Sequence, residues 1–194
     1  ELLLQRVFYL GLWIAGALTI LAYLLSRLTF AQPERVILDF GLTGLTIANS
    51  GLAILLAAPL IPKELERRTA WVVLAHPVSR VQFYLGKWLG LIAVLKINLA
   101  ITALIYVAIS RAVGADWSRE LFQSVTLVEP EMILLASFAL WLSTRGAVGI
   151  TVMASIALFL AGHSTSQWEF LIQKATDSGS RVLFQGLKAL IPNL

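Results

Sequence analysis

Apolar residues dominate five stretches of this sequence, and polar residues separate them. The stretches cover residues 7–25, 40–61, 88–110, 127–142 and 146–162. A helix that crosses a bilayer needs about 20 mostly apolar residues, within a range of about 17–25. The pattern therefore predicts an all-α, polytopic membrane helix bundle with five visible spans. No linker divides the chain, so we expect residues 1–194 to form a single transmembrane domain.

The fourth stretch is interrupted by Glu129, Pro130 and Glu131. Residues 132–142 alone would extend only about 16 Å as a helix, at 1.5 Å per residue. We therefore expect this helix to start near Thr126 or Leu127, with Pro130 in its first turn, where its missing N–H costs little. Both glutamates are then expected near the membrane interface, at the positive end of the helix dipole.

The last 32 residues, 163–194, do not have the pattern of a standard span. His163 opens a polar cluster, a second polar break covers residues 177–180, and Pro192 ends the last apolar stretch. This pattern predicts that residues 163–194 form a re-entrant or interfacial hairpin of two short helices on the outer side, with the fifth span ending near Gly162.

The composition agrees with a membrane protein. Hydrophobic residues make up 58% of the chain and charged residues 13%, about half the charged share of a soluble domain. This argues against a soluble enzyme domain. There is no cysteine, so neither a disulfide framework nor a Cys-based metal site is expected, and two histidines, His76 and His163, are too few for a His-rich metal site.

Residues 62–87 form the most informative polar segment. They contain five of the basic residues: Lys63, Arg67, Arg68, Arg80 and Lys87. Because basic residues concentrate in cytoplasmic loops, we expect this segment and the N-terminus to face the cytoplasm. The segment predicts a short helix over residues 63–75 that ends before Pro77. Ser79 and Gln82 fit a capping box, which predicts a second helix that runs directly into the third span.

Several features of residues 61–90 resemble the loop between the second and third spans of ABC-2-type transporter permeases. The shared features are an acidic residue (Glu64 or Glu66), Arg68-Thr69, the sequence Leu74-Ala75-His76-Pro77-Val78-Ser79-Arg80, and Gly86-Lys87 at the next span. The most similar subgroup is the one associated with multicopper-enzyme maturation, and residues 190–194 resemble the segment before its last span. Such permeases have six spans, so a sixth is expected but absent from this sequence.

The resemblance implies that residues 62–87 form a coupling helix that docks on a separate cytoplasmic ABC ATPase. The residues expected to carry this coupling are Glu64, Glu66, Arg67, Arg68, Thr69, Pro77 and Arg80. It also implies a second permease copy or a paralogue as partner, and the bacterial inner membrane as location. An alternative reading of the same segment is an interfacial helix that only anchors two spans.

No catalytic or nucleotide-binding motif is present. The chain has no G-x-x-x-x-G-K-[ST], no H-E-x-x-H and no G-x-S-x-G. We therefore expect no catalysis and no cofactor in this chain, no nucleic-acid partner, and ATP and Mg bound by the partner ATPase.

Lys96 is the charged residue furthest inside a predicted span. It either extends toward the cytoplasmic interface or lines a polar translocation path with Asn98 or Asn49. Taken together, these features predict the permease subunit of an ATP-driven exporter. The alternatives are a secondary carrier that uses Lys96, Glu129 and Glu131 for ion coupling, and a non-transporting membrane assembly factor.

Overall fold

The computed structural model describes residues 6–28, 33–66, 79–112, 114 and 119–164. This part of the chain is helical. The helices are α1 (Arg6–Leu28), α2 (Pro33–Ala57), α3 (Leu60–Glu66), α5 (Arg80–Ala112), α6 (Arg119–Ser143) and α7 (Val148–His163). The predicted all-α membrane bundle is confirmed.

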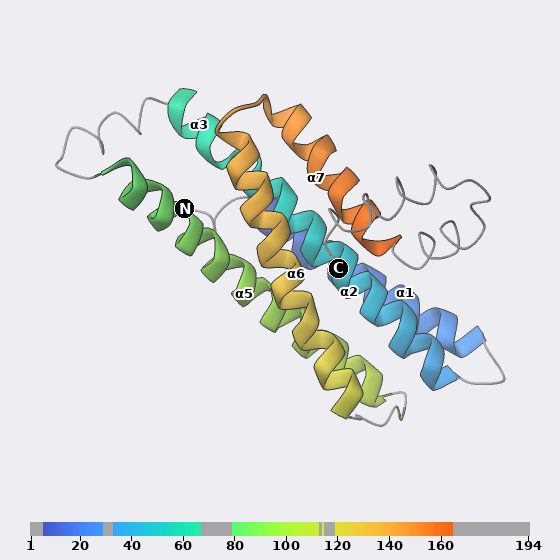
Figure 1. Cartoon of the computed structure of the whole chain (residues 1–194). Coiled ribbons are helices and arrows are strands. Elements are labelled where there is room, and N and C mark those ends of the chain that lie inside the picture. The colour runs from blue at the N-terminus through green and yellow to red at the C-terminus, as the bar shows by residue number, and fades with distance from the viewer. Residues whose placement is uncertain (1–5, 29–32, 67–78, 113, 115–118, 165–194) are drawn as a thin grey trace, which may run out of the picture.

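The long helices lie side by side and alternate in direction (Figure 1). The end of α1, the start of α2, the end of α5 and the start of α6 lie at one end of the bundle. The opposite end holds α3, the start of α5 and the turn between α6 and α7. We call this second end the loop end, because it also borders residues 67–78. The alternation places the described parts of the 62–87 segment, residues 62–66 and 79–87, at the same end as the α6–α7 turn.

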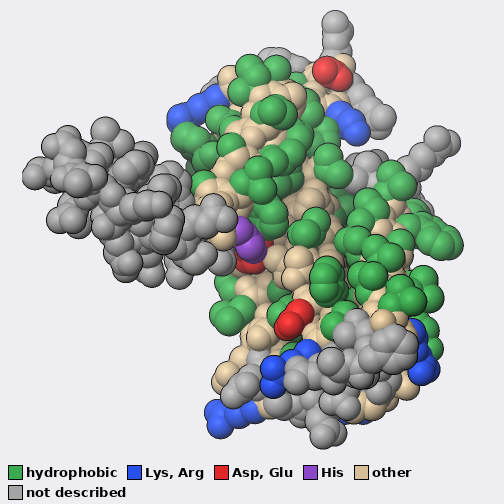
Figure 2. All heavy atoms as spheres, turned by 90° about the vertical axis from the view of Figure 1, so that its right-hand side faces the viewer, with side chains coloured by type: hydrophobic (Ala, Val, Ile, Leu, Met, Phe, Trp, Pro, Cys, Tyr) green, Lys and Arg blue, Asp and Glu red, His purple; other side chains and the backbone are tan. Residues whose placement is uncertain are grey.

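Helix α2 is at the centre of the bundle. It packs against α1, α5, α6 and α7. The largest fully buried apolar side chains come from α2, α5 and α6 and include Leu45, Leu56, Leu91, Leu95, Tyr106, Met132, Leu135 and Leu140. Apolar side chains also cover much of the outer surface, and Lys and Arg side chains gather toward its ends (Figure 2).

Small residues bring α1 and α2 close together. A Cβ atom added to Gly44 would lie 2.9 Å from Leu18 Cβ, and one added to Gly11 would lie 2.8 Å from Leu52 side-chain atoms. Ala15 and Ala48, one turn from these glycines, are buried. In lipid there is little hydrophobic drive between helices, so close packing through small residues is a main source of their association.

Four helical segments are long and apolar enough to cross a membrane: Tyr9–Leu28, Arg35–Glu66, Val81–Ala112 and Leu121–Ser143. Helix α7 is shorter, with 16 residues, or about 24 Å of helix. The described part of the chain thus has four full-length candidate spans and one shorter apolar helix where the sequence predicted five spans. The chain is an integral membrane protein.

The prediction for the start of the fourth span was wrong. Helix α6 begins at Arg119, not near residue 127, so Pro130 lies inside the helix rather than in its first turn. Glu129 and Glu131 therefore lie near the middle of α6 and not in its first turn. Proline is tolerated inside a membrane helix because neighbouring groups satisfy the backbone carbonyl that it leaves without a donor. The helix thus continues through Pro130.

The second span also differs from its prediction. Its helix begins at Pro33, seven residues before the apolar run, and a turn at Ala58 and Pro59 divides the run into α2 and α3. Proline at residue 59 cannot donate to the preceding turn, which favours a break there. The expected helix over 63–75 is described only to Glu66, where it belongs to α3, and the rest lies outside the described residues.

The other boundaries agree more closely with the sequence. Helix α5 is one continuous helix from Arg80 to Ala112, as the capping box predicted. Helix α7 ends at His163, close to the predicted end at Gly162. The expected outer hairpin, apart from His163 and Ser164, lies outside the described residues.

Candidate functional site

The start of α5 is fixed by a reciprocal pair of hydrogen bonds. The Gln82 backbone N–H donates to Ser79 Oγ at 3.2 Å, and the Ser79 backbone N–H donates to Gln82 Oε1 at 2.9 Å. Together they form the predicted capping box and satisfy two backbone donors that a helix start leaves without partners. The chain that enters α5 from residues 67–78 therefore has a defined first turn.

An ion pair connects the two sides of the same segment. Lys87 Nζ on α5 donates to Glu64 Oε1 on α3. The lysine side chain is 32% exposed and the glutamate side chain 19%. Lys87 Nζ also lies 5.7 Å from the centre of the Phe83 ring, one turn earlier on α5, within the range of a cation–π interaction. The pair therefore holds α3 against α5 at the loop end.

One residue further along, Trp88 connects α5 to α6. Its Nε1 donates to Ser137 Oγ at 2.8 Å, and Ser137 Oγ donates to the Ile133 carbonyl at 2.7 Å. The serine hydroxyl thus uses both its acceptor and its donor capacity. Because α3 also packs against α6, the three helices form one connected group at the loop end.

The structure places the predicted coupling residues in different surroundings. Glu64 is partly buried and pairs with Lys87, whereas Glu66, the last residue of α3, is exposed. Arg80 is the first residue of α5, and nothing is described of its side chain. The remaining predicted coupling residues, Arg67, Arg68, Thr69 and Pro77, lie outside the described residues.

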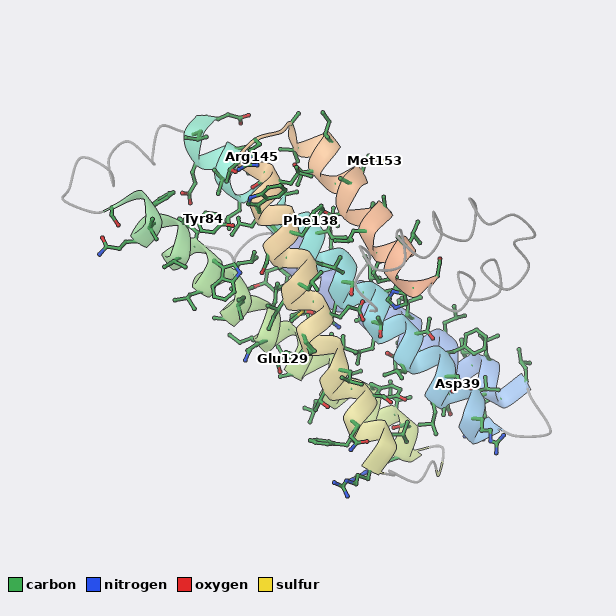
Figure 3. The ribbon with its side chains drawn as sticks, in the orientation of Figure 1. Asp39, Tyr84, Glu129, Phe138, Arg145 and Met153 are labelled. Carbon is green, nitrogen blue, oxygen red and sulfur yellow. The ribbon has the colours of Figure 1, made fainter. Side chains whose placement is uncertain are left out.

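A second ion pair lies near the middles of α5 and α6. Lys96 Nζ on α5 lies 2.7 Å from Glu129 Oε1 on α6, and the two side chains are 54% and 39% exposed. Lys96 is the middle residue of the 33-residue α5. In Figure 3, Glu129 projects from α6 on the side of α5. The lysine therefore has a carboxylate partner at a depth where charged groups are costly and are usually paired.

The other two predicted path residues, Asn49 on α2 and Asn98 on α5, lie where α2 contacts α5. Asn49 Nδ2 donates to Thr102 Oγ1 at 3.1 Å, and Thr102 Oγ1 lies 3.0 Å from the Asn98 carbonyl. Both asparagines are buried, and Asn49 Oδ1 and Asn98 Nδ2 have no hydrogen-bond partner in the described part of the chain. Lys96 and Asn98 are two residues apart, which is about 200° around a helix. The three predicted path residues are therefore not one site.

Glu131 belongs to a third polar group, which the sequence did not predict. Ser50 Oγ on α2 donates to Glu131 Oε1 at 2.8 Å, and His163, at the end of α7, interacts electrostatically with the same carboxylate. The His163 ring also contacts Phe159, with Nδ1 3.2 Å from the Phe159 carbonyl. Because Glu129 and Glu131 are two residues apart, α6 presents one carboxylate toward α5 and the other toward α2 and α7.

The sequence carried a partial signal for these groups. Thr102 is one turn after Asn98 and so shares its face of α5. The partners Ser50 and His163 carried no such signal, since they come from helices far away in the sequence. Among the described residues, no group of three or more His, Asp or Glu side chains converges as a candidate metal site.

Comparison with known proteins places the chain in a family. Residues 22–178 match the sequence model of the family described as ABC-2 family transporter protein. This chain belongs to that family. The match extends from α1 to beyond α7 and covers most of the chain. No curated protein and no solved structure matches it.

Membership confirms the family resemblance noted in the sequence of residues 61–90. The protein is therefore a membrane component of the ABC-2 transporter family. Members of this family associate with an ABC ATPase. The narrower resemblance to permeases of multicopper-enzyme maturation stays a prediction.

Proposed function

We propose that this ABC-2 family protein is the permease subunit of an ATP-driven exporter, and that residues 62–87 couple it to a separate cytoplasmic ATPase. In this proposal the chain itself is not catalytic, and the ATPase binds ATP and Mg. The partner in the membrane is a second copy or a paralogue. The loop end and the N-terminus face the cytoplasm, and the membrane is the bacterial inner membrane.

The observation that carries the proposal is the way the segment is attached to the bundle. Its first part, α3, is held to α5 by Glu64 and Lys87, and its last part is the capped first turn of α5. Helix α5 then runs without a break across the bundle. A push on residues 62–87 by an ATPase would therefore pass into a spanning helix as a rigid-body movement.

The polar groups near mid-depth are the candidates for contact with the transported substrate. Lys96 and Glu129 lie at the bundle surface in the described structure, so a path lined by them would run along α5 and α6. Asn49 and Asn98 are enclosed between α2 and α5, so they would meet a substrate only after these helices separate. In our proposal Lys96 is the path residue already accessible, and the two asparagines become accessible during the cycle.

Purification of the intact transporter tests the coupling proposal. The double charge reversal Arg67→Glu with Arg68→Glu should lower ATPase recovery and transport while leaving the protein inserted. In the proposal these arginines pair with the ATPase, and truncating one partner of a buried, hydrogen-bonded charge pair costs about 2–5 kcal/mol. The matched control is Arg35→Glu with Arg111→Glu, which reverses two exposed arginines at the other end of the bundle. Normal ATPase recovery and transport in the Arg67/Arg68 variant would contradict coupling through these arginines.

Accessibility tests the orientation. The chain has no cysteine, so a single Thr69→Cys variant is the only thiol present. We expect an impermeant thiol reagent to label it from the cytoplasmic side alone. Labelling from outside would overturn the proposed topology.

A secondary carrier is the second candidate, because Lys96, Glu129 and Glu131 all lie near mid-depth. Such residues can couple a substrate to protons or ions. Proteoliposomes separate the two functions. An exporter should transport only with ATP and its ATPase present, whereas a carrier should respond to an ion gradient without ATP.

A further inference from the structure

The two residues of the loop-end ion pair are 23 positions apart in the sequence. Between them lie the end of α3, residues 67–78 and the start of α5. The pair therefore joins the first part of the proposed coupling segment, α3, to its last part, the start of α5. Both partners match features of the family-like loop, the acidic residue for Glu64 and the Gly-Lys for Lys87, but the sequence did not show that they meet.

The burial of the pair argues against a docking role for Glu64. Its side chain is only 19% exposed and its carboxylate already accepts from Lys87. If this carboxylate docked on an ATPase, it would have to give up its partner. Lys87, whose side chain is 32% exposed and whose ammonium lies beside the Phe83 ring, would then be left without Glu64. The exposed Glu66 has no such constraint from Lys87.

The Glu64–Lys87 pair lies next to contacts with α6. Trp88, the residue after Lys87, donates to Ser137 at 2.8 Å, and α3 packs on α6. Helices α3, α5 and α6 are thus held together within one turn of the ion pair. With the pair closed, a force on the segment moves these helices as a unit. With the pair broken, α3 would lose this direct connection to α5, and less of the movement would reach α5.

We propose that Glu64 and Lys87 are positioning residues for energy coupling: their ion pair closes the base of residues 62–87 and stays closed while the segment moves α5 and α6. This inference rests on the proposed function and deepens it, because it assigns Glu64 to the force path within the permease and not to the ATPase surface.

Charge swapping tests the pair in the intact transporter with its ATPase. Glu64→Lys and Lys87→Glu should each keep ATPase binding but lower substrate transported per ATP hydrolysed by about fivefold or more, the lower range of a typical coupling between sites. The double variant E64K/K87E restores opposite charges and should recover most of that ratio. Asp39→Lys makes the same charge change at an exposed residue at the other end of the bundle and should leave the ratio unchanged.

A cross-link tests whether the pair stays closed. In the cysteine-free chain, Glu64→Cys with Lys87→Cys can be joined by a short bifunctional thiol reagent. The joined protein should transport at a rate close to that of the unmodified chain, because the proposal requires no opening. Loss of transport on joining, with ATPase still bound, would overturn it, and this readout does not depend on whether the charge variants fold.

The results also separate this inference from the proposed function. If the unaltered chain recovers no ATPase, the proposed function fails. If the ATPase is recovered and couples normally in E64K, or if E64K/K87E does not restore the ratio, only the positioning role fails.

Discussion

The contact between α1 and α2 and the contact between α5 and α6 are built from different kinds of residue. Between α1 and α2, Gly11 and Gly44 allow the backbones to approach until an added Cβ would meet Leu52 or Leu18 within 3 Å. Helices α5 and α6 also contribute to the shared apolar core, but two polar pairs connect them directly, Trp88 with Ser137 and Lys96 with Glu129. Both pairs of helices are antiparallel neighbours in the same bundle (Figure 1).

This difference follows from the choices that a membrane offers. Lipid tails are as apolar as leucine, so helices associate through close packing or through polar contacts. Close packing depends on shape at many points and resists sliding. A polar contact is concentrated at two side chains, and its partners can be exchanged. The α1/α2 contact therefore has the character of a fixed support, while α5 and α6 have connections that a change in charge can break.

The largest expected effect is at the polar contact near mid-depth. Glu129→Lys places a second lysine beside Lys96 and leaves both without a carboxylate, at a cost of about 2.5–3.5 kcal/mol for an unpaired lysine at the centre of a span. We expect a clear loss of thermal stability of the detergent-purified protein. The swap K96E/E129K should restore most of it. Equal stability of the single variant and the swap would show that the pair does not connect α5 and α6.

The next effect tests the close-packed contact. Gly44→Leu must push Leu18 and hence α1 away from α2, because Leu18 Cβ is fixed to its backbone. Overpacking of this kind costs about 1–3 kcal/mol, which should lower folded yield and thermal stability. Gly51→Leu is the control on the same helix, since nothing lies within 4 Å of a Cβ added there. If both variants behave alike, close approach at Gly44 does not hold α1 to α2.

A smaller effect is expected at Trp88. Trp88→Phe keeps an aromatic ring but removes the donor to Ser137, and hydrogen bonds between membrane helices average about 0.6 kcal/mol, with a maximum of about 1.7. Stability should fall only slightly. Ser137→Ala should give a similar small loss, and the double variant should add little to either, as expected for two partners of one bond. Additive losses would mean that the residues act separately.

Local features of the sequence determined much of the fold. Long apolar runs with few charges predicted the helices, because a backbone in lipid must satisfy its hydrogen bonds within its own segment. The capping box of Ser79 and Gln82 was predicted because its two partners are three residues apart. The family-like features of residues 61–90 identified the family for the same reason, since they lie within one stretch of sequence.

Tertiary structure alone decided which charged and polar side chains meet. Glu64 forms an ion pair with Lys87 at the loop end, and Lys96 forms one with Glu129. Ser50 donates a hydrogen bond to Glu131. Each pairing depends on the register of neighbouring helices, and a shift of two residues turns a side chain about 200° away from its partner. The position of Glu129 and Glu131 within their helix was mispredicted for a related reason. The preference for proline in the first turn of a helix placed the start near residue 127. That local preference does not show that the helix extends back to Arg119, with Pro130 inside it.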